Sequence, residues 1–228
     1  MITRFRFVLV SDLKAYLGGR TFIKIHLFYL VILSLLLIII WPADTSLNFQ
    51  QPQLLLVLTY AQIVILTYLG GRLATGISLD NEEISFDDWL KHTPLTCEEI
   101  VMGKWGGIFL IILFIFFSSL PLSVLAYFME GATIKSVLRV YFLILLPIIT
   151  FINFGLFFRF IIATPGISSF ILNIATILFL LGLFLSRTTK VELLYLNSRF
   201  LLLAFLLSFL PLSIVLRKLK TTVHHFNF

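Results

Sequence analysis

Six long apolar runs constrain the fold more than any other feature of this sequence. A run of about 20 predominantly apolar residues is long enough to cross the hydrocarbon core of a bilayer as one helix. The runs are Phe22–Trp41, Gln53–Thr75, Trp105–Met129, Val137–Phe160, Ile167–Ser186 and Phe200–Leu216. Together they use most of the 228 residues, and only 12% of the residues are charged, about half of the ~25% usual in soluble domains. The sequence therefore predicts one all-α integral membrane domain over 1–228, with six transmembrane helices and no separate soluble domain.

The distribution of basic residues predicts the orientation of these spans. With six spans the two termini share a side, and twelve basic residues then lie on that side or at its interface. The five on the other side are Lys135, Arg139, Arg187, Lys190 and Arg199. Cytoplasmic loops carry the excess of Lys and Arg, so both termini are expected in the cytoplasm. The net charge of +6 then reflects topology and does not argue for a nucleic-acid partner, and the expected location is a prokaryotic cytoplasmic membrane, crossed several times.

The two ends of the chain carry their own patterns. Apolar residues in 1–20 recur at intervals of three and four between basic residues, which predicts an amphipathic helix lying along the cytoplasmic interface near anionic head groups. The alternative is a frayed, positively charged flank. The last residues, 217–228, form a basic and aromatic tail that we expect to be disordered and solvated.

Small and polar residues inside the spans suggest how the helices meet. Glycines flank the loop between spans two and three, and we expect them to let these two spans approach closely; they are Gly70, Gly71, Gly76, Gly103, Gly106 and Gly107. Polar residues and prolines interrupt several spans, at Gln62, Ser118, Ser119, Pro121, Pro147, Asn153, Asn173 and Pro211. They could line a translocation path or form hydrogen bonds between helices, and we favour the hydrogen bonds.

The sequence lacks the common catalytic signatures. It has no HExxH, no GxSxG and no intramembrane pair of aspartates, and no ionisable residue lies convincingly deep in a span. It also has no GxxxxGK[ST] nucleotide loop, so the chain is expected to be non-catalytic and to draw any ATP-derived energy from a partner. No metal or cofactor is expected in this chain, because its one cysteine, Cys97, has no partner at ligand spacing.

One long polar stretch, 78–104 (SLDNEEISFDDWLKHTPLTCEEIVMGK), holds seven of the eleven acidic residues. Ser85 precedes Asp88 by three residues, and Thr96 precedes Glu99 by three, and both spacings are typical of helix starts. Pro94 separates the two, because the residue before a proline is pushed out of the α region. The pattern predicts a short helix over about 86–92, a corner, and a second helix that runs into the membrane.

This stretch resembles the cytoplasmic loop between the second and third spans of ABC type-2 permeases, the membrane subunits of ABC exporters. The matching residues are Glu82-Glu83, Ser85, Phe86, Leu90, Thr93-Pro94-Leu95-Thr96, Glu99-Ile100 and Gly103-Lys104. Ile84 departs from the family pattern, which has a glycine before the serine. The six spans and the leading amphipathic helix extend the resemblance to the whole chain.

The resemblance implies that the short helix of this loop docks, as a coupling helix, on a separate ATP-binding subunit that carries ATP and Mg²⁺. It also implies a second permease subunit, in a homodimer or a heterodimer. The residues implied in docking are Glu82, Glu83, Ser85, Phe86, Asp87, Asp88, Trp89, Leu90, Thr93, Pro94, Glu99 and Lys104. Phe86, Trp89 and Leu90 are the candidate anchors, because interface energy concentrates in such side chains. The carboxylates would set orientation and encounter rate more than affinity.

Two other interpretations stay open. The chain could be an ABC-like scaffold that passes ATPase motion to a partner protein without transport. It could also be a membrane component of the heme-exporter-B type, from cytochrome c maturation, which has about this length and the same six-span plan. The short outer loops argue against relatives with large periplasmic domains. Substrate and direction of transport cannot be derived from these residues.

Overall fold

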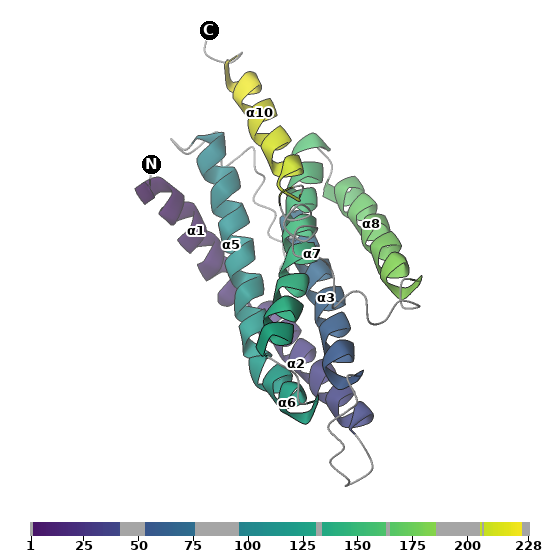
Figure 1. Cartoon of the computed structure of the whole chain (residues 1–228). Coiled ribbons are helices and arrows are strands. Elements are labelled where there is room, and N and C mark those ends of the chain that lie inside the picture. Colours follow the sequence, from purple (N-terminus) through teal and green to yellow (C-terminus); the bar gives the residue numbers. More distant parts are fainter. Residues whose placement is uncertain are drawn as a thin grey trace.

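A computed structural model describes residues 2–41, 53–75, 96–130, 134–162, 165–185, 206 and 208–224. Within these ranges all regular structure is α-helical, which confirms the all-α part of the predicted fold class (Figure 1). The helices are α1 (Ile2–Leu17), α2 (Arg20–Ile40), α3 (Gln53–Ala74), α5 (Cys97–Ser118), α6 (Leu120–Glu130), α7 (Ile134–Ile161), α8 (Pro165–Leu185) and α10 (Leu210–His224).

Four segments are long and apolar enough to cross a membrane: Arg20–Ile40, Val57–Ala74, Glu98–Ser118 and Val140–Ile161. They correspond to the first four predicted spans. A shorter apolar segment, Gly166–Phe179, overlaps the fifth, and α10 begins at Leu210, well inside the sixth. Because α10 continues to His224, the tail that was expected to be disordered is helical as far as that residue. The chain is therefore a helical protein with at least these four spanning candidates, and the count of six stays a prediction.

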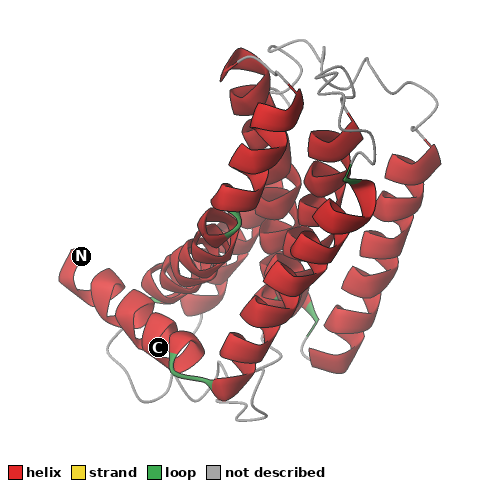
Figure 2. Ribbon diagram, turned by 90° about the horizontal axis from the view of Figure 1, so that it is seen from below, coloured by secondary structure: helices red, strands yellow, loops and turns green. Residues whose placement is uncertain are grey.

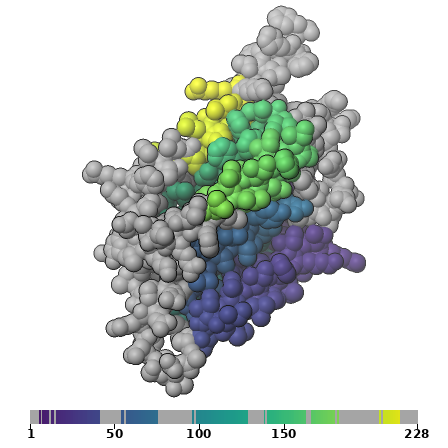
Figure 3. Space-filling view, turned by 90° about the vertical axis from the view of Figure 1, so that its right-hand side faces the viewer, coloured from purple at the N-terminus to yellow at the C-terminus, as the bar shows by residue number. Residues whose placement is uncertain are grey.

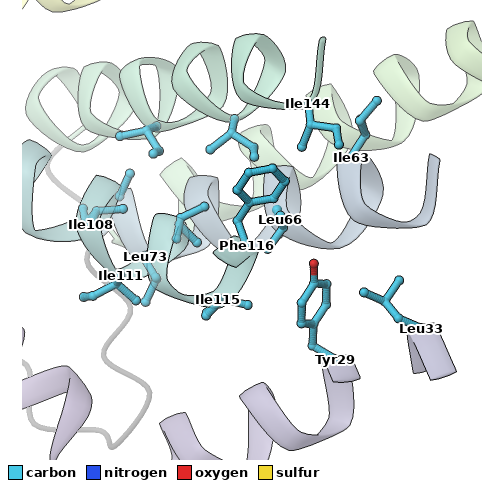
Figure 4. Close-up of a cluster of buried hydrophobic side chains, with 14 of the residues drawn as sticks. Tyr29, Leu33, Ile63, Leu66, Leu73, Ile108, Ile111, Ile115, Phe116 and Ile144 are labelled. Carbon is cyan, nitrogen blue, oxygen red and sulfur yellow. The ribbon is translucent and has the colours of Figure 1, made fainter. Parts of the chain in front are cut away.

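The centre of the bundle is the pair formed by α3 and α7, which make the most extensive contact between two helices. Leu58 and Leu66 of α3 and Ile144, Ile148 and Ile152 of α7 are almost completely buried. Figure 4 shows how other helices complete this core: Tyr29 and Leu33 of α2 approach it from one side, and Phe116 of α5 lies near Leu66.

Glycines let the two central helices come this close. A Cβ added at Gly155 of α7 would lie 2.6 Å from the Ala74 Cβ and 2.8 Å from the Gly71 carbonyl oxygen of α3. Lower in the same contact, a Cβ at Gly70 would lie 3.1 Å from Ile152. Residue numbers increase in the same direction along both helices at this contact, so α3 and α7 run parallel. Small residues at a helix contact are how helices in lipid gain van der Waals contact, because apolar surface is not driven out of hydrocarbon.

The glycines beside the polar loop make their closest approaches to helices other than the one that the sequence suggested. A Cβ at Gly71 would meet Leu172 of α8 at 2.8 Å, and one at Gly103 would meet Val8 of α1 at 2.7 Å. The closest approaches therefore join α3 to α7 and α8, and α5 to α1. Spans two and three do contact each other, and a Cβ at Gly70 would also lie 3.8 Å from Ile112 of α5, but the tightest approaches at Gly71 and Gly103 are made to other helices, because a glycine marks a close approach without naming what approaches.

The first helix, α1, packs along the beginning of α5 and meets α2 at an angle (Figures 1 and 2). The turn between α1 and α2 falls at Gly18-Gly19, where the Gly18 N–H donates to the Lys14 carbonyl and Gly19 is extended as the N-cap of α2. The amphipathic helix expected over 1–20 is thus a helix, and Val8 on its inner side is completely buried.

The outer faces of α2 and α8 are covered with large apolar side chains. Phe28 and Ile39 on α2, and Phe170 and Leu178 on α8, are each more than 60% exposed. Figure 3 shows one such face, with α2 below α3 and α8 above it. Exposed apolar surface of this extent suits hydrocarbon rather than water.

Candidate functional site

The polar stretch 78–104 is described by the structure from Thr96 onward. The predicted docking residues Glu82, Glu83, Ser85, Phe86, Asp87, Asp88, Trp89, Leu90, Thr93 and Pro94 lie outside the described residues, and so does the short helix expected there. Glu99 and Lys104 lie in the first two turns of α5, with Glu99 buried and Lys104 partly exposed.

The capping box predicted at Thr96 is confirmed. The Thr96 Oγ1 accepts a hydrogen bond from the Glu99 N–H at 3.3 Å, and the Thr96 N–H donates to the Glu99 Oε2 at 2.9 Å. The first N–H groups of a helix have no partner within the helix, and this reciprocal pair satisfies two of them. The beginning of α5 is therefore fixed at Cys97, eight residues before the predicted start of span three.

The first turns of α5 are packed into the protein. Glu99 is only 6% exposed, and Ile100 and Val101 are completely buried. Gly103 lies against Val8 of α1, so close that a Cβ at Gly103 would overlap the Val8 side chain. Helix α1 therefore covers this part of α5. The end of the polar stretch is therefore part of α5 and packs against α1.

One turn further, α5 is tied to the centre of the bundle. The Trp105 Nε1 donates to the Asn153 Oδ1 of α7 at 2.7 Å, and the Asn153 Nδ2 donates to the Ser208 carbonyl at 2.7 Å. The Trp105 ring also stacks on Phe109, with centroids 5.2 Å apart. Asn153 is completely buried, so its amide joins α5, α7 and the turn before α10 in a place without water.

A buried polar cluster lies near the other end of α5. The Tyr29 hydroxyl donates to the Ser119 Oγ at 2.9 Å, and the Gln62 Nε2 donates to the Ser119 Oγ and to the Ser123 Oγ at 3.0 Å each. Ser119 in turn donates to the Phe116 carbonyl at 2.7 Å. All four polar side chains are at most 3% exposed. The cluster joins α2, α3, α5 and α6 at one point.

Ser119 also separates α5 from α6, so the single helix predicted over Trp105–Met129 is wrong. Ser119 ends α5 with φ −87° and ψ −2°, and its N–H donates to the Phe116 carbonyl in a tighter turn. The cause is Pro121, which has no N–H and whose ring excludes a regular preceding turn. The Ser118 and Ser119 hydroxyls donate to the carbonyls of Ile115 and Phe116, in the turn before the break.

The chemistry of these clusters is that of hydrogen bonding. Tyrosine and glutamine donate to serine hydroxyls there, and Ser119 donates to a backbone carbonyl, with no carboxylate or imidazole in the bonds described. Among the described residues no group of three or more His, Cys, Asp or Glu could hold a metal ion. At Gln62, Ser119 and Asn153 the structure thus supports hydrogen bonds between helices rather than a polar path, whereas Asn173 is exposed on α8.

Sequence reasoning missed Tyr29 and Ser123 as members of the cluster, and missed the bond between Trp105 and Asn153. A signal was present in Tyr29, because a tyrosine in the middle of an apolar span must find a partner for its hydroxyl. Which of the other polar residues supplies that partner depends on the helix arrangement.

Comparisons with protein-family models, with curated proteins and with solved structures found no match to this chain.

Proposed function

We propose that this chain is the permease subunit of an ATP-driven ABC-type exporter, coupled through 78–104 to a separate ATP-binding subunit. The observation that carries the proposal is the attachment of this polar stretch: its sequence matches a coupling loop, and it leads into a capped, buried helix start rather than into a free loop. ATP and Mg²⁺ would bind to the partner, and a second permease subunit would complete the transporter.

In this proposal α5 is the element that conveys motion from the loop. A displacement of the loop reaches α5 through the capping box, because Thr96 and Glu99 fix the first turn to the preceding backbone. The bond between Trp105 and Asn153 carries it to α7. The break at Ser119 lets α6 keep its position while α5 tilts, since the two helices are not one rigid rod.

The charges at the helix ends support a cytoplasmic location for this loop. Arg72 lies in the last turn of α3 and Arg159 in the last turn of α7, and Lys104 lies in the second turn of α5. All three belong to the end of the bundle from which 76–95 departs. An excess of basic residues at one end is the pattern of a cytoplasmic face.

The test is co-purification with the ATP-binding subunit. The native chain is isolated from its membrane in mild detergent, the accompanying proteins are identified by mass spectrometry, and Trp89→Ala is compared with the wild type. A stoichiometric protein with a GxxxxGK[ST] loop is expected with the wild type, and Trp89→Ala should weaken its association by on the order of 2 kcal/mol, roughly 30-fold. Trp41→Ala is the matched control, because Trp41 is exposed at the far end of α2.

Full recovery of the ATPase with Trp89→Ala would remove that residue as an anchor. Recovery of an envelope protein in place of any ATPase would contradict the transporter proposal and favour the scaffold. The orientation has its own test, because a membrane-impermeant thiol reagent should label Cys97 only from the cytoplasmic side.

A further inference from the structure

The outer side of α1 carries a stripe of alternating basic and apolar residues that are exposed in the described part of the chain. Arg6, Val10, Lys14 and Leu17 recur at intervals of four, four and three, and all four are exposed. This spacing places them on one side of the helix, opposite Val8, which is buried against Gly103. We call these four residues the α1 stripe.

The helix that follows shows where the α1 stripe lies relative to a bilayer. Up to Lys24 the exposed residues of α2 still include basic ones, but from Leu27 to Ile39 the large exposed side chains are all apolar. The 19 residues from Ile23 to Trp41 rise by roughly 27 Å, close to the ~30 Å thickness of the hydrocarbon core. The start of α2 is therefore one edge of that core, and α1 lies beside this edge, at the depth of the lipid head groups.

The composition of the α1 stripe matches the chemistry at that depth. Two cationic side chains alternate with two apolar ones, so the apolar pair can enter the boundary of the acyl chains while the long cationic stems reach head-group phosphates. Asp12 is the one acidic residue of α1, against Arg4, Arg6 and Lys14. A neutral zwitterionic surface would leave this excess positive charge without partners, whereas an anionic surface attracts it.

We propose that the α1 stripe binds anionic phospholipid, and that the chain selects such lipid at this position over zwitterionic lipid. Because Gly103 holds α1 against the first turns of α5, the bound lipid also fixes the start of α5 relative to the membrane surface. That last consequence rests on the proposed function, in which α5 conveys motion from the loop. The lipid selection itself requires neither an ATPase nor transport.

The experiment places a fluorescent probe on the α1 stripe. The full chain carrying Cys97→Ser and Val10→Cys is labelled with an environment-sensitive dye and reconstituted into phosphatidylcholine vesicles. In one series, phosphatidylglycerol brominated in its acyl chains replaces part of the phosphatidylcholine. In a second series, brominated phosphatidylcholine replaces it. Comparing how strongly the two brominated lipids quench the dye gives their relative binding constant. The dye at Leu27→Cys serves as the depth reference, because that side chain faces outward inside the apolar part of α2.

Each basic residue near an anionic surface contributes ≈ 1 kcal/mol, so Arg6 and Lys14 together should favour phosphatidylglycerol by roughly 30-fold at low salt. Arg6→Gln combined with Lys14→Gln should bring the ratio of the two lipid binding constants close to one. High salt should reduce the same ratio in the chain with the unmodified stripe. Arg139→Gln, at the other end of the bundle, is the matched control and should leave the preference unchanged.

Three results would overturn the proposal. Equal quenching by the two lipids would show that charge does not select the lipid, and a preference that survives the double substitution would assign it to another part of the chain. Quenching at Leu27→Cys without quenching at Val10→Cys would show that the α1 stripe faces water or a protein partner with an acidic surface. None of these outcomes depends on whether an ATPase binds to 78–104.

Discussion

Replacing Gly155 by alanine tests the close contact of the two central helices. The added Cβ would lie 2.6 Å from the Ala74 Cβ and 2.8 Å from the Gly71 carbonyl oxygen. Carbon atoms in ordinary contact lie about 3.5–4.0 Å apart, so α7 must withdraw from α3 by about 1 Å. Neither neighbouring atom belongs to the end of a flexible side chain, so rotamer changes cannot relieve the overlap.

Two effects of opposite sign decide the size of the change. Alanine is the better helix former by about 0.8–1.0 kcal/mol, which stabilises α7. Overpacking of a close contact costs about 1–3 kcal/mol, and the withdrawal also loosens Ile148 and Ile152 from α3. We expect a net loss of about 1–2 kcal/mol in the free energy of unfolding.

The assay is reversible unfolding of the purified chain in mixed detergent and dodecyl sulfate micelles, followed by far-UV circular dichroism. Gly166→Ala is the matched control, because a Cβ at Gly166 of α8 meets nothing within 4 Å. That variant should be neutral or slightly stabilised. Equal stability of the two variants would refute the idea that Gly155 is there to let α3 and α7 meet.

Three further experiments, which use four substitutions, probe the bonds along α5 in the same unfolding assay. A double-mutant cycle of Gln62→Ala and Ser119→Ala should give a coupling of about 0.6 kcal/mol, the average for hydrogen bonds between membrane helices, and strict additivity would argue against this bond. Thr96→Ala should cost about 1 kcal/mol and speed amide exchange in the first turn of α5, whereas unchanged exchange would show that the cap contributes nothing. Trp105→Phe keeps an aromatic ring but removes the donor to Asn153, so a loss of about 1 kcal/mol is expected, and no loss would mean that water or another group replaces it.

The parts of the fold that could be predicted are those that depend on neighbouring residues in the sequence. The capping box at Thr96 and Glu99 was predictable because both of its bonds close within one helical turn. The approximate positions of the four spanning candidates were predictable from the length of their apolar runs, since a lipid-facing helix needs no particular partner to be recognised, but the third begins and ends earlier than predicted.

What could not be predicted depends on which helices meet. Pro121 indicated a disturbed helix, but the same residue can kink a helix or end it, and the Ser119 turn is held by Tyr29 and Gln62 from other helices. Gly103 indicated a close approach without indicating that α1 is the neighbour. Of the predicted docking residues the structure describes only Glu99 and Lys104, so the docking role of the polar stretch stays a prediction.

The parallel pairing of α3 with α7 has a consequence for biosynthesis. Ala74 and Gly155 are 81 positions apart. At about 5–20 residues per second, the ribosome therefore adds Gly155, which contacts α3, roughly 4–16 s after α3 itself is complete. The α3 segment is also the least hydrophobic of the four spanning candidates and carries Gln62. A nascent chain that ends before α7 should therefore hold α3 poorly in the bilayer, and the Ser119 and Ser123 hydroxyls that accept from Gln62 would be among the few polar groups able to retain it. Membrane insertion of α3 is then a cooperative event in which a helix made later secures one made earlier.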